Sequence, residues 1–148
     1  MLISHKPAND GILTVFQKIP SELTDKAETL LKFVGLHQKR KLRAGDLSFG
    51  QQKLLELAMA LMNEPKMLLL DEPTAGINPT LINGIIDRLI KVNQEYGITL
   101  LVIEHNMKVI MNLAQKVFCL AHGQMLANGT PEEIRNDKRV LDAYLGAQ

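Results

Sequence analysis

The sequence has no tryptophan, one cysteine, two tyrosines and four phenylalanines among its 148 residues. So few aromatic rings offer no platform on which the bases of single-stranded nucleic acid would stack. Charge of one sign is also scarce, because seventeen basic and sixteen acidic side chains leave a formal charge of +1. Such a balance creates no field that would gather nucleic acid or anionic lipid. We therefore expect no nucleic-acid partner.

The scarcity of cysteine and of long apolar runs is informative about the cellular compartment of the protein. Cys119 cannot form an internal disulfide, and its apolar neighbours predict a small buried side chain in a reducing cytosol. No stretch approaches the ~20 apolar residues that a membrane-spanning helix needs. Residues 1–10 also lack the basic and then apolar pattern of an export signal. We therefore expect a cytoplasmic protein without direct membrane insertion.

One motif is absent as well. The sequence has no Gly-Lys dipeptide and hence no G-x-x-x-x-G-K-[ST] loop. That loop supplies the backbone N–H groups and the lysine that hold nucleotide phosphates in P-loop proteins. Any nucleotide chemistry of these residues therefore needs a phosphate cradle from elsewhere.

Hydrophobic periodicity predicts an α/β protein. Continuous apolar runs at residues 67–70 and 98–103, joined by a long helix after Pro79, predict two parallel strands buried on both faces. Residues 1–20 are interrupted by proline and glycine and are expected to form a loop. The other predicted elements are helices over residues 25–35, 50–62 and 107–114, a β-hairpin of residues 117–120 and 125–127 around Gly123, and two short helices opened by Thr130 and Asp137.

Acidic residues follow both predicted strands. Asp71 and Glu72 end the first apolar run, and Glu104 ends the second. Open α/β sheets bind ligands beyond the carboxyl ends of their strands. Adjacent carboxylates there suit phosphate-ester hydrolysis, in which Asp71 would hold Mg²⁺ and Glu72 would accept a proton from the attacking water. For an isolated Asp-Glu pair, the simpler interpretation is the end of a strand.

The residues before the second helix also allow two interpretations. Ser48 with Gln51 three residues later forms the pattern of a capping box. The same helix start presents free N–H groups and positive partial charge, and Gly50 would let a phosphate approach the backbone. In that interpretation Ser48, Gly50 and Gln51 bind a γ-phosphate.

His105 directly follows the second strand. A lone histidine is more often structural. If the two strands are neighbours, however, His105 lies near Glu72 and can bind the γ-phosphate or orient the attacking water.

Together, in this order and spacing, these segments resemble the ATP-binding subunits of ABC transporters. Residues 47–52 are similar to the family signature LSGGQ, residues 67–72 to the Walker B strand with its catalytic glutamate, residues 75–78 to the D-loop, and His105 to the switch histidine. The resemblance covers nearly the whole chain. It implies a partial P-loop NTPase fold with a mostly parallel sheet remnant and a helical signature subdomain.

The amino-acid sequences of several segments are most similar to those of the branched-chain amino-acid importers of that family. Two substitutions depart from the common pattern: Phe49 replaces a glycine of the signature, and Asn78 stands where many relatives have aspartate. We also expect Asn78 to contribute to nucleotide binding. Gln17 is a tempting match to the glutamine loop, but it lacks a strand context and is interpreted as an ordinary loop residue.

The resemblance implies a function and partners. The parent protein would bind ATP and Mg²⁺, pair head to tail with a second ATP-binding subunit, and drive transmembrane permease subunits from the inner face of the cell membrane. We expect this chain to be its C-terminal portion, divided into residues 1–66 (signature subdomain), 67–130 (catalytic core) and 131–148 (terminal helices). The alternative is a non-catalytic module that donates its signature motif to an intact ATPase partner.

Overall fold

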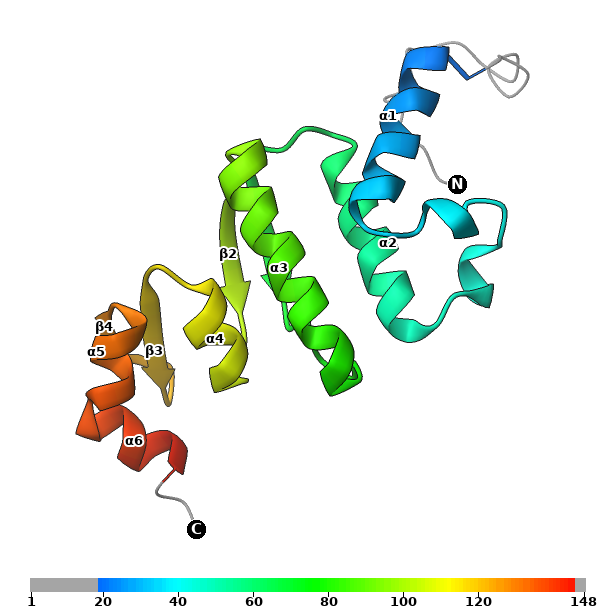
Figure 1. Ribbon diagram of the computed structural model, residues 1–148. Coiled ribbons are helices and arrows are strands. Elements are labelled where there is room, and N and C mark those ends of the chain that lie inside the picture. The colour runs from blue at the N-terminus through cyan, green and yellow to red at the C-terminus, as the bar shows by residue number, and fades with distance from the viewer. Residues whose placement is uncertain (1–18, 146–148) are drawn as a thin grey trace. The chain divides into compact units, whose positions relative to one another are not determined.

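The computed structural model describes residues 19–145 of the chain (Figure 1). The predicted loop of residues 1–20, with Gln17, lies almost wholly outside the described residues. The described part forms two compact units, one of residues 19–70 and 75–101 and one of residues 71–74 and 102–145. The three-part division by motif stays a prediction.

The order of elements is that of an α/β chain, as expected. No helix among residues 19–145 is both long and apolar enough to cross a membrane. In chain order the elements are α1 (Ser21–Phe33), the 3-10 helices η2 (His37–Lys39) and η3 (Ala44–Asp46), α2 (Phe49–Leu61), β1 (Met67–Asp71), α3 (Pro79–Tyr96), β2 (Thr99–Ile103), α4 (Met107–Leu113), β3 (Val117–Ala121), β4 (Gln124–Gly129), α5 (Pro131–Asn136) and α6 (Lys138–Leu145).

Helix α1 begins at Ser21, so the predicted start near Asp25 is wrong. Pro20 precedes the helix, and its carbonyl accepts the N–H of Thr24 at 3.3 Å. Proline suits a helix start because its missing N–H would have no partner there. At the other end Gly35 has φ +76° and completes a Schellman motif, in which its N–H donates to the carbonyl of Lys32.

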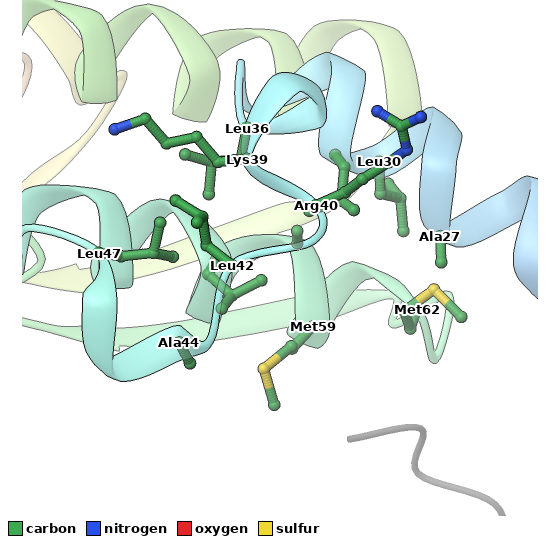
Figure 2. Close-up of a pocket in the computed structure, with 13 residues that line it drawn as sticks. Ala27, Leu30, Leu36, Lys39, Arg40, Leu42, Ala44, Leu47, Met59 and Met62 are labelled. Carbon is green, nitrogen blue, oxygen red and sulfur yellow. The ribbon is translucent and has the colours of Figure 1, made fainter. Parts of the chain in front are cut away.

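Helices α1 and α2 pack together and leave an apolar cavity of about 170 Å³ between them (Figure 2). Met59 of α2 and Met62, directly after that helix, line it on one side, and Ala27 and Leu30 line it from α1. Lys39 and Arg40 are the basic members of its lining, as the complete set shows: Ala27, Leu30, Leu31, Leu36, Lys39, Arg40, Leu42, Ala44, Leu47, Leu55, Ala58, Met59 and Met62.

Strands β1 and β2 are hydrogen-bonded neighbours, with α3 as the connection between them. The N–H of Thr99 donates to the carbonyl of Lys66 at 3.0 Å, and the N–H of Glu72 donates to that of Ile103 at 2.9 Å. The first bond joins the beginnings of the two strands and the second joins their ends, so the strands are parallel. Their carboxyl ends therefore lie at one edge of the sheet, as the sequence predicts.

The prediction that these strands are buried on both faces is wrong. Leu68 is 8% exposed, whereas Leu69, the next residue along β1, is 72% exposed. Met67 and Leu101 are also about half exposed. Alternate residues of a strand point to opposite faces, and in the described residues this sheet has only two strands. One apolar face of this sheet therefore remains uncovered in the part of the chain that the structure describes.

The second unit is built on the β3–β4 hairpin, whose strands pair antiparallel as predicted. His122 and Gly123 form its two-residue turn, both with positive φ. The hairpin packs with α5 and α6 around a small apolar core of Val117, Cys119, Ala127, Ile134 and Val140. Cys119 is buried there, as expected, and burial raises the pKa of its thiol. This core belongs to the same compact unit as residues 71–74 and 102–106, which carry the candidate site.

Candidate functional site

Glu72 and His105 meet at the carboxyl end of the parallel strands. Glu72 follows β1 and His105 lies two residues after β2. His105 Nδ1 lies 3.0 Å from Glu72 Oε1. Both side chains are well exposed, 48% for Glu72 and 71% for His105. The structure thus brings together the two residues predicted to be catalytic and leaves them accessible to a ligand.

The contact with Glu72 determines which nitrogen of the His105 ring carries a hydrogen. An ionised carboxylate offers only acceptor oxygens, so His105 Nδ1 must carry the hydrogen in this contact. His105 Nε2 is then left as the ring nitrogen for a further partner. The pair therefore places a proton acceptor, Glu72, beside a ring whose second nitrogen can contact a bound group.

The backbone of Glu72 is strained. Its φ is +44°, in the left-handed region that residues with a Cβ rarely adopt. The hydrogen bond from the Glu72 N–H to the Ile103 carbonyl helps to hold the backbone in this conformation. Such strain costs about 1–3 kcal/mol and is concentrated at functional sites.

Asp71 is exposed at the last position of β1. Among residues 19–145 no group of three or more acidic, histidine or cysteine side chains could hold a metal ion alone. Mg²⁺ usually binds one or two carboxylates together with substrate phosphates and water, so it needs no such cage. Asp71 fits that mode as a single protein ligand. Its metal role stays a prediction.

Glu104 contributes to the site in a way that the sequence did not reveal. Its Oε1 accepts the N–H of Thr74 at 3.2 Å and also the Thr74 hydroxyl hydrogen. Its Oε2 accepts the N–H of Asn106 at 3.2 Å. Thr74 is only 5% exposed and is a buried polar residue. The sequence signal was an acidic residue before His105, but its partner is thirty residues away.

The predicted phosphate-binding residues Ser48, Gly50 and Gln51 lie at the start of α2. The N–H of Ser48 donates to Gln51 Oε1 at 3.1 Å within a capping box, as predicted. Ser48 is exposed, whereas Gly50 is buried. A Cβ on Gly50 would lie 3.1 Å from Leu81 Cδ1 and 3.6 Å from Ile77 Cγ2. Gly50 thus has a packing reason as well, and phosphate binding by these residues stays a prediction.

Asn78 caps helix α3. Its Oδ1 accepts the N–H of Thr80 at 3.0 Å and the Thr80 hydroxyl at 2.8 Å. Just before it, Gly76 has φ +69°, and a Cβ there would lie 3.2 Å from the Phe49 ring. The start of α2 and the segment before α3 therefore touch within the first unit, whereas Asp71, Glu72 and His105 belong to the second.

The sequence model of a family described as ABC transporter matches residues 1–75, half of the chain. The chain belongs to the ABC transporter family. A second model, described as branched-chain amino acid ATP-binding cassette transporter, matches residues 124–148.

Curated relatives agree with this membership. The high-affinity branched-chain amino acid transport ATP-binding protein LivG of Salmonella typhimurium is 39% identical over 152 residues, covering 99% of this chain and 60% of that protein. BraF of Pseudomonas aeruginosa, a high-affinity branched-chain amino acid transport ATP-binding protein, is 36% identical over the same coverage. The chain thus spans about 60% of the length of the curated relatives it matches.

Solved structures confirm the fold. The ADP conformation of MJ1267, an ATP-binding cassette of an ABC transporter, superposes with a TM-score of 0.77 at 34% identity, covering 90% of this chain and 55% of that one. A nucleotide-free ATP-binding cassette from an ABC transporter gives the same TM-score and identity over 93% and 57%. The expected partial P-loop NTPase fold of an ABC ATPase is therefore confirmed.

Proposed function

We propose that this chain forms the part of an ATP-hydrolysing ABC cassette that carries the catalytic carboxylate and the signature helix, and that the cassette drives import of branched-chain amino acids. The contact of Glu72 Oε1 with His105 Nδ1 at 3.0 Å carries this proposal. It lies where an α/β sheet binds ligands, and it combines a general base with a second polar group for the transferred phosphate.

In this proposal Glu72 is the general base. Water attacks the γ-phosphorus, the bond from phosphorus to the bridging β–γ oxygen breaks, and Glu72 accepts the proton of the water. His105 keeps a hydrogen on Nδ1 toward Glu72, and Nε2 would hydrogen-bond the γ-phosphate as a donor when it carries a second hydrogen. A positioned base of this kind contributes about 10²–10⁴-fold to the rate.

Asp71 would hold Mg²⁺ at this site. The ion neutralises phosphate charge when bound and shares its other positions with phosphate oxygens and water. Because Asp71 and Glu72 are adjacent, the metal-binding carboxylate and the base are placed by the same strand end.

Ser48, Gly50 and Gln51 would bind the γ-phosphate of a nucleotide held by a second ATP-binding subunit. The exposed Ser48 before the first turn of α2 supports this role, because backbone N–H groups and the positive partial charge of a helix N-terminus attract anions. Asn78 at the start of α3 would contribute from the same unit. The two subunits would pair head to tail and drive transmembrane permease subunits from the cytoplasmic face of the membrane.

The substrate class rests on the relatives. LivG and BraF bear names of branched-chain amino acid transport proteins at 39% and 36% identity. The match of residues 124–148 to the branched-chain family model supports the same class.

The hydrolytic role is tested with a chimera in which the phosphate-loop segment of a full-length relative precedes this chain. The chimera should hydrolyse ATP, and Glu72→Gln should lower its turnover about 10²–10⁴-fold, because glutamine cannot accept the proton. The 148-residue chain alone should show negligible turnover. Chimera turnover that Glu72→Gln leaves unchanged would refute the hydrolytic role. ATP hydrolysis by the chain alone, well above its own Glu72→Gln variant, would refute the need for a phosphate loop from elsewhere.

A second arm separates the alternative of a donor module. The chain is mixed with a full-length relative and ATP turnover is measured. A donor should stimulate the relative, and this stimulation should be lost with Ser48→Ala but kept with Glu72→Gln. The proposed hydrolytic role instead requires Glu72 in the chimera.

A further inference from the structure

Glu104 is the one carboxylate of the site that neither the family match nor the proposed chemistry assigns. It lies between β2 and His105 and is half-buried. Its three hydrogen bonds reach two segments: Thr74, two residues after Glu72, and Asn106, directly after His105. One side chain thus connects the segments that follow both members of the Glu72–His105 pair.

We propose that Glu104 is a positioning residue that sets the geometry of the Glu72–His105 pair. The proposal rests on the proposed function for the use of the pair, but its geometry can be measured without nucleotide. The residues on one side of Glu72 are fixed by the backbone bond from its N–H to the Ile103 carbonyl. Glu104 fixes the other side through Thr74.

The position requires a carboxylate. Both oxygens of Glu104 accept hydrogen bonds, and Oε1 accepts two. Glutamine has the same shape but only one acceptor oxygen, so its amide group would face a donor at Thr74 or at Asn106. With the amide group at Thr74, this buried residue loses an acceptor, which is costly for a polar group out of contact with water. With the amide group at Asn106, the Asn106 N–H loses its acceptor instead. Release of either segment lets Glu72 and His105 separate.

The test is the ¹⁵N spectrum of the His105 ring in the full chain. In the wild type Nδ1 should carry the hydrogen, because it donates to Glu72. Glu72→Ala, which removes the acceptor, gives the reference for a disrupted pair. Glu104→Gln and Thr74→Val should both shift the Nδ1 resonance most of the way to that reference, while the midpoint of thermal unfolding reports that the chain remains folded.

Two conservative variants control for unrelated effects. Thr74→Ser keeps the hydroxyl and should retain the wild-type resonance, and Glu132→Gln, an exposed charge change on α5, should do the same. The proposal is overturned if Thr74→Val and Glu104→Gln leave the Nδ1 resonance at its wild-type position, or if Glu132→Gln shifts it equally. If Glu104→Gln does not fold, the Thr74→Val and Thr74→Ser comparison decides.

This experiment can fail independently of the proposed function. A wild-type ring that already gives the Glu72→Ala spectrum would show that the pair itself does not form, which contradicts both. A pair that forms but ignores Glu104 contradicts the positioning role alone. Loss of turnover in the chimera with Glu72→Gln bears only on the hydrolytic role.

Discussion

Glu72 combines a strained backbone with a side chain that holds His105. Its φ of +44° is positive, and among the described residues only two others with a Cβ have a positive φ, Glu64 and His122. Neither of those has a comparable polar contact with a candidate catalytic group. Since left-handed backbone costs a residue with a Cβ about 1–2 kcal/mol, the local fold retains Glu72 at the expense of stability.

Asparagine tolerates the left-handed region better than glutamic acid or glutamine. Glu72→Asn should therefore be more stable to unfolding than Glu72→Gln by about 1 kcal/mol, although both lose the carboxylate. Urea unfolding of the two variants measures the difference. Asp71→Asn, in the extended backbone of β1, should give no such gain. Equal stability of the two Glu72 variants would show that the strain is not present in solution.

Among the elements, the β3–β4 hairpin has a turn that its sequence fits only in part. A two-residue turn with positive φ at both positions favours Asn-Gly. Here the pair is His122-Gly123, with φ of +50° and +75°. Gly123 matches the requirement and His122 does not.

His122→Asn should stabilise the hairpin by a few tenths to about 1 kcal/mol, because asparagine accepts positive φ more readily. Gly123→Ala should lower stability by a similar or larger amount, since it introduces a Cβ at positive φ. Thermal unfolding of the full chain detects both changes. A decrease with His122→Asn would argue for an unrecognised contact of the His122 ring.

Helix α5 begins with a capping box that depends on pH. The N–H of Thr130 donates to Glu133 Oε2 at 2.7 Å, and this contact lowers the pKa of Glu133 below its ordinary value of 4.5. A lowered folded pKa means that the ionised form contributes stability above that ordinary value, and the contribution is lost as pH falls through the folded pKa.

Glu133→Gln should therefore destabilise the chain at neutral pH, and the difference from wild type should shrink below the ordinary pKa of 4.5. Denaturant unfolding as a function of pH measures this convergence. Glu132→Gln, in the same helical turn, controls for the interaction of an acidic side chain with the helix N-terminus. A difference that stays constant with pH would contradict the capping role of the carboxylate.

The elements were predictable where their boundaries depend on local chemistry. Ser48 with Gln51, Thr130 at the start of α5, and the glycine of the hairpin turn each act within a few residues, and the structure places them as predicted. The adjacency of Glu72 and His105 followed from the strand ends. Glu104 was missed because its partner Thr74 depends on the pairing of β1 with β2, which no local pattern specifies.

At the scale of the whole molecule, the main feature of residues 19–145 is an apolar sheet face without a cover. The predicted burial of both strands on two faces is wrong there, because that pattern describes a sheet with covered faces. Leu69, Met67 and Leu101 expose apolar area there. Exposed apolar patches of this kind promote association.

Two neighbouring residues of β1 should therefore respond in opposite ways. Leu68→Ala should lower the free energy of unfolding by about 2–5 kcal/mol, because Leu68 is buried. Leu69→Lys should change stability by less than about 0.5 kcal/mol but reduce self-association, which light scattering measures. Strong destabilisation by Leu69→Lys would mean that this face is covered in solution.

The contacts at Gly50 and Gly76 have a mechanical consequence. Gly50 lies against Ile77 and Leu81, and Gly76 lies against the Phe49 ring, so the start of α2 and the residues around the start of α3 are in direct contact. A displacement of the first turn of α2 must carry the turn before α3 with it. An anion bound at Ser48 that displaces the start of α2 would thus also displace Asn78. A bulkier residue at Gly50 or Gly76 would disrupt the contact and uncouple the two segments.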